Sequence, residues 1–243
     1  MNRLYLLELR PDPVALLRFV RSRGLEAQGQ EDDFGYAVHA WLRAAFGSLA
    51  PQPWRLFTDR RRALRILGYG AYDANDLRQH LAEFADPQTF AACPDPDQLI
   101  LGKPMPTWQK GRRLGFELLC CPVGRTSENG AEKDLFLLRA DAAGAERLSR
   151  EAVYCAWAAE HLQLADACSV AHARMTGFRL VRQQRRPEGP DGHRASAYLV
   201  RPQVLVQGDL TVGDPEAFTH LLVSGIGRHK AFGYGMLLLR PAP

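Results

Sequence analysis

The order of the predicted strands and helices is the feature that most limits the possible folds. Short apolar runs and helical periodicities follow one another as strand-helix-strand-strand-helix-strand, roughly twice along the 243 residues. This order is typical of the ferredoxin-like module, in which helices pack on one face of an antiparallel sheet. We therefore predict an α+β fold of two tandem ferredoxin-like (RRM-like) modules with antiparallel sheets.

The boundary between the two modules is expected in a polar segment near the middle of the chain. Residues 123–134 (VGRTSENGAEKD) are rich in turn-forming residues and poor in apolar ones. We assign residues 1–124 to an N-terminal module, which contains a helix over 36–46, and residues 135–243 to a C-terminal module. The second module is expected to open with a strand over 135–138.

Composition excludes several classes of protein. Apolar residues make up 46% and charged residues 24% of the chain, which is ordinary for a globular protein. No apolar stretch is long enough to span a membrane, and Glu8 and Arg10 interrupt the first apolar run, so a cytoplasmic protein is expected. The five cysteines form no C-x-x-C pair, and therefore neither a disulfide framework nor a zinc site is predicted.

Positive charge is concentrated in one segment of the C-terminal half. Residues 174–201 hold seven arginines against two acids, Glu188 and Asp191, an excess of five charges in a chain whose net charge is +4. The planar guanidinium binds two phosphate oxygens at once, so an arginine cluster suits a phosphate ligand. The segment reads as a long β-hairpin, and a solvated surface hairpin is the alternative interpretation.

The glycine-rich segment 225–235 (GIGRHKAFGYG) is the most informative motif. Its four glycines allow positive φ and close approach to a ligand, and Arg228, His229 and Lys230 lie between them. Backbone N–H groups combined with cations form an anion site. A dinucleotide-binding loop is excluded because here a helix precedes the glycines and a strand follows, the reverse of that motif. A plain turn between helix and strand is the alternative.

Together with the residues that follow it, this loop (GIGRHKAFGYGMLLLRP) resembles the C-terminal signature of a known family. The family is that of the CRISPR repeat-processing endoribonucleases of the CasE type, members of the RAMP superfamily found in Cascade complexes. Shorter similarities lie upstream, at Val206–Val212, at Tyr154–Trp157, at Phe116–Leu118 with Pro122, and in the Tyr-x-x-His spacing of Tyr36 and His39.

The resemblance implies an activity and partners. A member of this family is expected to cleave precursor CRISPR RNA within the repeat stem-loop, without a metal ion or other cofactor. A ribose 2′-hydroxyl attacks the neighbouring phosphate, which leaves 2′,3′-cyclic phosphate and 5′-hydroxyl ends, and the enzyme stays bound to the mature guide RNA. The implied partners are the repeat RNA stem-loop and other subunits of a CRISPR ribonucleoprotein effector complex, and not a membrane.

The resemblance also suggests site residues. Tyr36 and His39 are the catalytic candidates, because imidazole titrates near pH 6.5 and the two residues share a helix face with Arg43. The predicted RNA-binding residues are cationic side chains and loop glycines: Arg23, Arg43, Arg179, Arg182, Arg185, Arg186, Gly225, Gly227, Arg228, His229, Lys230 and Gly233.

Three alternatives stay open. Residues 10–35 form a longer connection than the family is expected to have, and the arginines of its added helix (Arg18, Arg21, Arg23) could supplement or replace a histidine-based site. The resemblance does not separate a type I-E from a type IV system. The chain could also be a non-catalytic guide-RNA-binding subunit, whereas a general RNA-binding protein with RRM-like modules is disfavoured because no aromatic RNP motif occurs.

The arginine-rich hairpin generates a first prediction. Replacing two of Arg179, Arg182, Arg185 and Arg186 with alanine should weaken binding of a repeat hairpin RNA steeply. The salt dependence of binding should flatten by about 0.7–0.9 in logarithmic slope per lost phosphate contact. Affinity measured over a salt series tests this, and unchanged hairpin affinity would contradict the assignment.

Overall fold

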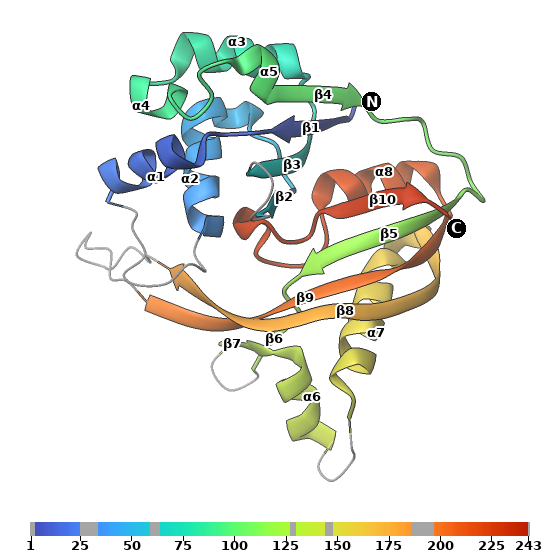
Figure 1. The fold of residues 1–243 in the computed structure, drawn as a ribbon. Helices are drawn as coiled ribbons and strands as arrows, with labels where there is room; N and C mark the ends of the chain where they lie inside the picture. Colours follow the sequence, from blue (N-terminus) through green and yellow to red (C-terminus); the bar gives the residue numbers. More distant parts are fainter. Residues whose placement is uncertain are drawn as a thin grey trace. The chain divides into compact units, whose positions relative to one another are not determined.

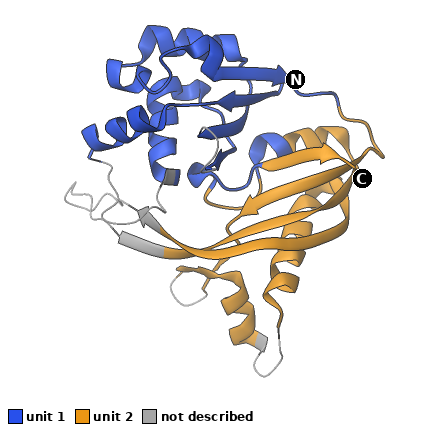
Figure 2. Ribbon diagram, viewed as in Figure 1, with its two compact units in different colours: residues 1–107, 222–225, 230–236 blue, residues 108–221, 226–229, 237–243 orange. Residues whose placement is uncertain are grey.

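The computed structural model describes residues 3–24, 34–58, 64–126, 130–143, 148–185 and 197–242, and in these ranges it contains two four-stranded sheets (Figure 1). All strand pairs within both sheets are antiparallel. The chain divides into two compact units, each built around one sheet (Figure 2). The predicted α+β class with two ferredoxin-like modules is therefore confirmed.

Unit 1 contains one complete strand-helix-strand-strand-helix-strand motif. Its strands are β1 (Tyr5–Leu9), β2 (Trp54–Phe57), β3 (Arg65–Gly70) and β4 (Ile100–Pro104), in the spatial order β2-β3-β1-β4. Helix α2 (Phe34–Phe46) connects β1 to β2, and α3 (Ala74–Phe84) connects β3 to β4. Strand β1 lies inside the sheet because it pairs with both β3 and β4.

Additional short helices of unit 1 begin where the sequence supplies an aspartate followed by proline. They are α1 (Pro13–Ser22), α4 (Pro87–Phe90) and α5 (Pro96–Leu99). In each, the carboxylate of the preceding Asp accepts a hydrogen bond from a backbone N–H of the first turn. Proline suits the first helical position because its missing N–H would be unpaired there in any case.

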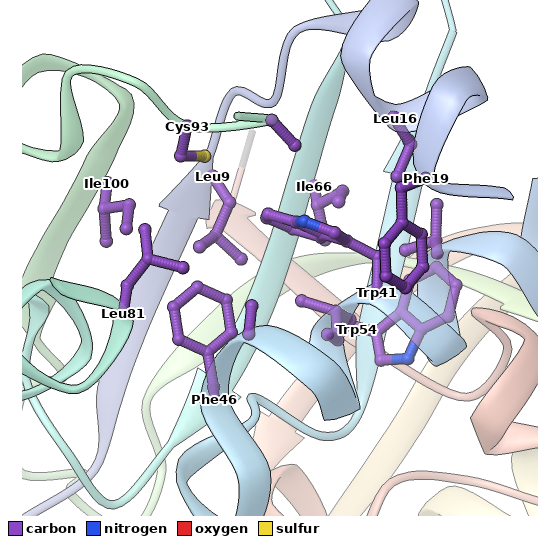
Figure 3. Packing of buried hydrophobic residues seen from close by; sticks show 14 of the residues in the cluster. Leu9, Leu16, Phe19, Trp41, Phe46, Trp54, Ile66, Leu81, Cys93 and Ile100 are labelled. Carbon is purple, nitrogen blue, oxygen red and sulfur yellow. The ribbon is translucent and has the colours of Figure 1, made fainter. Parts of the chain in front are cut away.

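The core of unit 1 determines which face of α2 stays outside. Leu7 and Leu9 of β1 point to one side of the sheet and are fully buried, as expected for alternate residues of a strand. Trp41 and Phe46 of α2 pack edge to face in the same core, with residues of α1 and α3 around them (Figure 3). The side of α2 that carries residues 36, 39 and 43 is left less buried.

Unit 2 repeats the same topology with a different set of strands. They are β5 (Arg113–Cys120), β8 (Cys168–Arg185), β9 (Ala197–Val212) and β10 (Leu237–Pro241), in the order β10-β5-β9-β8. Helix α7 (Arg150–Leu162) precedes β8 and packs against it, and α8 (Pro215–Ser224) connects β9 to β10. The first strand of this repeat, β5, again lies inside its sheet between two neighbours.

The structure divides the chain at a different place from the expected modules. Strand β5, which the boundary near residue 124 placed in the first module, pairs with β9 and β10 in the second sheet. The polar segment around residue 128 connects β6 (Val123–Arg125) and β7 (Glu132–Asp134), two strands of a small hairpin within unit 2. The turn-forming residues therefore belong to a hairpin. The first segment of unit 1 ends at residue 107, and the strands that follow it pair in the second sheet.

One predicted element is of the wrong type. The strand expected over 135–138 is the first part of α6 (Leu135–Ala143). The Asp134 carboxylate accepts a hydrogen bond from the backbone N–H of Phe136 at 2.8 Å, which starts the helix. A short apolar run does not distinguish strand from helix by itself, and here the preceding aspartate and the helix-favouring leucines decide.

A buried polar cluster fixes α7 to the small hairpin. The hydroxyl of Tyr154 donates to Asp134 at 2.7 Å, and the Arg150 guanidinium donates to the same carboxylate at 3.1 Å. Asp134 is almost completely buried, so these bonds compensate the loss of its hydration. Tyr154 is thus a structural residue of the segment that resembled the family.

The structure also bears on membrane-spanning segments and on the cysteines. Among the described residues no helix is both long enough and apolar enough to cross a lipid bilayer. The five cysteines are free, and burial raises the pKa of the Cys93 and Cys121 thiols to about 12.

Two glycines of the β8–β9 ladder provide a stability test. A methyl group at Gly208 would lie 1.9 Å from the carbonyl oxygen of His172, whereas one at Gly177 would lie 3.4 Å from Leu205 Cβ, an ordinary contact. Gly208→Ala should lower the free energy of unfolding by about 1–3 kcal/mol or more, as overpacking does. Gly177→Ala, the matched control, should change it by less than about 1 kcal/mol. Urea unfolding followed by circular dichroism measures both, and equal effects would contradict the prediction.

Candidate active site

Tyr36, His39 and Arg43 form one face of α2. Their spacing of three and four residues brings the side chains to the same side of the helix. The Tyr36 and His39 side chains are half-buried and that of Arg43 is exposed. Within the described part of the chain, the Tyr36 hydroxyl and the His39 ring make no hydrogen bond, and Arg43 makes no ion pair. These polar groups are therefore available to an external ligand.

The environment of His39 favours its neutral form. Burial lowers the pKa of the imidazole below its usual value of 6.5, and the positive charge of Arg43 lowers it further. A neutral imidazole can accept a proton at physiological pH, as a general base must. Because the folded pKa is depressed, the contribution of His39 to stability is present above pH 6.5 and is lost as the pH falls through its folded pKa.

The glycine-rich loop lies against the beginning of α2. Residues 230–236 belong to unit 1, and their short helix η4 (Lys230–Phe232) contacts α2. The rings of Tyr36 and Phe232 stack, with centroids 6.4 Å apart and an angle of 29° between the planes. A side chain at Gly35 would meet the carbonyl oxygen of Phe232 at 2.9 Å. Glycine at position 35 thus allows η4 to approach the helix.

Two loop glycines are required by both conformation and space. Gly225 has φ +68°, and a Cβ there would lie 2.9 Å from Pro53 Cβ. Gly233 has φ +86°, and a Cβ there would lie 2.8 Å from the Trp54 ring. Positive φ strains residues with a side chain, and both positions also lack room for one. The glycines predicted to approach RNA therefore have a structural role within unit 1.

Lys230 and Arg23, both predicted to bind RNA, have partners within unit 1. The Lys230 ammonium donates to the carbonyl oxygen of Ser224 at 2.7 Å, where it satisfies a carbonyl at the C-terminal end of α8. The Arg23 guanidinium forms an ion pair with Asp86 at 2.7 Å and lies over the Phe19 ring. Each side chain still reaches solvent.

The remaining loop candidates belong to unit 2. Gly227 has φ +74°, and a Cβ at this position would lie 2.7 Å from the Trp157 ring. Arg228 and His229 both contact the carboxylate of Glu132, at 2.7 Å and 2.8 Å. His229 itself has φ +62°, a conformation that residues with a side chain adopt at a cost.

The arginines of the hairpin lie along β8. The side chains of Arg179 and Arg182 are exposed, and the Arg179 guanidinium donates to Gln203, its neighbour in register on β9. The backbone of Arg185 pairs with Ala197 near the end of the ladder. The side chain of Arg185 and the whole of Arg186 lie outside the residues that the structure describes.

The sequence matches a protein family described as CRISPR-associated protein over residues 4–241. The chain belongs to this family. A search of curated proteins found no match.

Solved structures show the fold of this CRISPR-associated protein in its relatives. This chain is 20% identical to Cse3 of Thermus thermophilus bound to an RNA representing a pre-cleavage complex. The alignment covers 98% of this chain and all of that chain, with a TM-score of 0.64. It is 22% identical, with the same coverage and a TM-score of 0.63, to the CRISPR endoribonuclease Cse3 bound to a 19-nucleotide RNA. A chain of a CRISPR RNA-guided surveillance complex in its pre-nicking state is 19% identical, with the same coverage and a TM-score of 0.52.

A basic depression and the acidic residue Glu132 were not predicted from the sequence. An open depression of about 550 Å³ in unit 2 is lined by Lys110, Arg112 and Arg113 beside Pro241 and Ala242. The run Lys-Gly-Arg-Arg would have indicated it. Glu132, which contacts three basic side chains, had no signal in the sequence because those side chains come from distant positions.

Among the described residues, no group of three or more His, Cys, Asp or Glu side chains is arranged to hold a metal ion. The histidines outside the candidate site have other roles where contacts are seen. His80 bonds to the carbonyl oxygen of Ala45 at 3.1 Å, and His161 to that of Trp157 at 2.9 Å.

The pKa of His39 gives a prediction for this site. In Arg43→Gln the imidazole should titrate at higher pH than in the unmodified protein, because the nearby positive charge is removed, but still below 6.5 because burial remains. Titration of the His39 ring signals by NMR measures the shift, and a His39→Gln variant assigns them. The control is Arg78→Gln on α3. An unchanged His39 pKa in Arg43→Gln would show that the two residues do not interact.

Proposed function

We propose that this protein is a metal-independent endoribonuclease that cleaves precursor CRISPR RNA within the repeat stem-loop and stays bound to the mature guide RNA. The proposal rests first on one observation. The face of α2 presents a hydroxyl, a neutral imidazole and a guanidinium with no hydrogen-bonding or ionic partner in the described residues. A histidine whose pKa is shifted by burial and by a neighbouring charge, beside other polar groups on one helix face, favours a functional role.

The three groups have the chemistry that RNA transesterification requires. His39 accepts the proton of the attacking 2′-hydroxyl, whose oxygen bonds to phosphorus while the bond from phosphorus to the 5′-oxygen breaks. The Tyr36 hydroxyl donates a proton to the departing 5′-oxygen, and Arg43 stabilises the negative charge that accumulates on the phosphate. The products are a 2′,3′-cyclic phosphate and a 5′-hydroxyl end. DNA lacks the attacking group and is not a substrate.

The family and the fold support RNA as the ligand. Two of the similar structures hold RNA, and one of these is described as an endoribonuclease complex. The exposed side chains of Arg179 and Arg182 point to opposite faces of β8 and offer separate phosphate contacts to an A-form stem, which proteins read mainly through its shape and backbone. A third similar chain belongs to a surveillance complex, so we also propose that this protein joins other subunits of a CRISPR effector complex.

Cleavage of labelled repeat RNA in EDTA tests the proposal. The protein should cut the all-ribose repeat and leave a substrate with a single 2′-deoxyribose at the cut site intact. His39→Ala should slow cleavage by about 100-fold to 10,000-fold, the usual range for losing a general base, with little effect on RNA affinity. His220→Ala, which changes an exposed histidine on α8, is the matched control and should cut normally.

Three other results of the cleavage assay would contradict parts of this proposal. Equal cleavage by His39→Ala would overturn the role of the imidazole and point to the arginines near α1. Tight binding of the repeat without any cleavage would support the alternative function, a non-catalytic guide-RNA-binding subunit. Cleavage of the deoxy substrate would exclude attack by the 2′-hydroxyl.

A further inference from the structure

Glu132 on β7 lies at the centre of three basic side chains of unit 2. Its Oε1 accepts a hydrogen bond from Arg228 Nη1 at 2.7 Å. Its Oε2 lies 2.8 Å from His229 Nε2 and 3.3 Å from Arg201 Nη2. These partners come from the glycine-rich loop and from β9, so one carboxylate connects three separate segments.

The cluster carries excess positive charge. Two arginines are always charged, and they face a single carboxylate. Burial by itself would raise the pKa of Glu132, but the hydrogen bond from Arg228 and the neighbouring charges outweigh it and lower the pKa. Burial lowers the pKa of His229 even though Glu132 opposes this. At neutral pH the cluster therefore holds two positive charges and one negative charge.

Arg228 is anchored on one side only. Its side chain is 45% exposed, while those of Glu132 and Arg201 are 20% and 9% exposed. The bond to Glu132 uses Nη1, and the edge formed by Nε and Nη2 makes no hydrogen bond in the described residues. This edge carries two parallel N–H donors, the arrangement that binds two oxygens of a phosphate.

We propose that Glu132 is a positioning residue that holds Arg228 so that its Nε/Nη2 edge binds a phosphate group of the RNA. The inference rests on the proposed function, because it takes RNA as the ligand of Arg228. Anchoring one side of the guanidinium removes rotamer freedom before binding, so less entropy is lost when the phosphate binds. Glu132 also fixes the His229 ring and thereby the loop segment that carries Arg228.

The structure favours positioning over competition between Glu132 and phosphate. If phosphate displaced the carboxylate, the buried charge of Arg201 would lose its ionic partner, which is costly in the interior. The open edge of Arg228 lets phosphate bind while Glu132 stays in place. The two mechanisms predict opposite effects of removing the carboxylate charge.

A double-mutant cycle with Glu132→Gln and Arg228→Ala tests the proposal through affinity for the repeat hairpin RNA. We expect Glu132→Gln to weaken binding about threefold to tenfold, and Arg228→Ala about fivefold to fiftyfold. Adding Glu132→Gln to Arg228→Ala should weaken binding no further, because Glu132 acts through Arg228. Glu132→Gln should also lower the melting temperature, because buried Arg201 loses its ionic partner. This decrease should be the same with and without Arg228, which separates stability from positioning.

Control variants make the outcome specific. Glu160→Gln removes another carboxylate of unit 2 that lies 3.7 Å from an arginine, and it should bind RNA at least as tightly as the unmodified protein. Tighter binding by Glu132→Gln would show competition and overturn the proposal. Equal weakening by Glu132→Gln with and without Arg228 would overturn it as well.

Arg228→Lys provides a test that does not depend on the stability of a Glu132 variant. Lysine keeps the charge but lacks the fork, so it cannot bind Glu132 and two phosphate oxygens together. Its affinity should fall close to that of Arg228→Ala, and wild-type affinity would overturn the proposal. Cleavage of the repeat by these variants at saturating RNA would show that the proposed nuclease activity stands even if the role of Glu132 does not.

Discussion

The close approach of the backbone at the glycine-rich loop is the constraint on which the candidate site depends. Gly225 and Gly233 adopt positive φ and leave no space for a Cβ against Pro53 and Trp54. Because these contacts hold the ends of the segment, η4 can lie along α2, where Phe232 stacks on Tyr36. The loop residues of unit 1 therefore support α2, the helix that carries Tyr36 and His39, in addition to any contact with RNA.

The basic residues of the glycine-rich loop differ in physical role from two exposed arginines, Arg43 and Arg182. Those of the loop have intramolecular partners: Lys230 satisfies a helix-end carbonyl, and Arg228 and His229 bind Glu132. Their first contribution is to shape the loop. The exposed side chain of Arg182 and that of Arg43 make no ion pair among the described residues, so their charge is available for a polyanion.

Secondary structure could be predicted wherever local signals were strong. Local signals are strong for the helices that begin after Asp12 and Asp73, because the aspartate caps and the apolar periodicity agree with the tertiary contacts. The strand expected over 135–138 failed, because four apolar residues fit a helix equally well. The boundary expected near residue 124 placed β5 in the first module, whereas β5 pairs with β9 and β10, which is a long-range choice. Site residues followed the same rule: the spacing of Tyr36 and His39 is local, whereas Glu132 meets its partners only after folding.

The sequence by itself determined the order of the elements, the α+β class, the family and the helix face that carries Tyr36 and His39, because these depend on periodicity, capping and short motifs. Tertiary structure decided which sheet β5 joins. It also decided that the Nε/Nη2 edge of Arg228 makes no hydrogen bond among the described residues. It also decided that the imidazole of His39 is shielded enough to stay neutral. Such properties depend on distances between residues far apart in the chain, and burial and charge act through those distances.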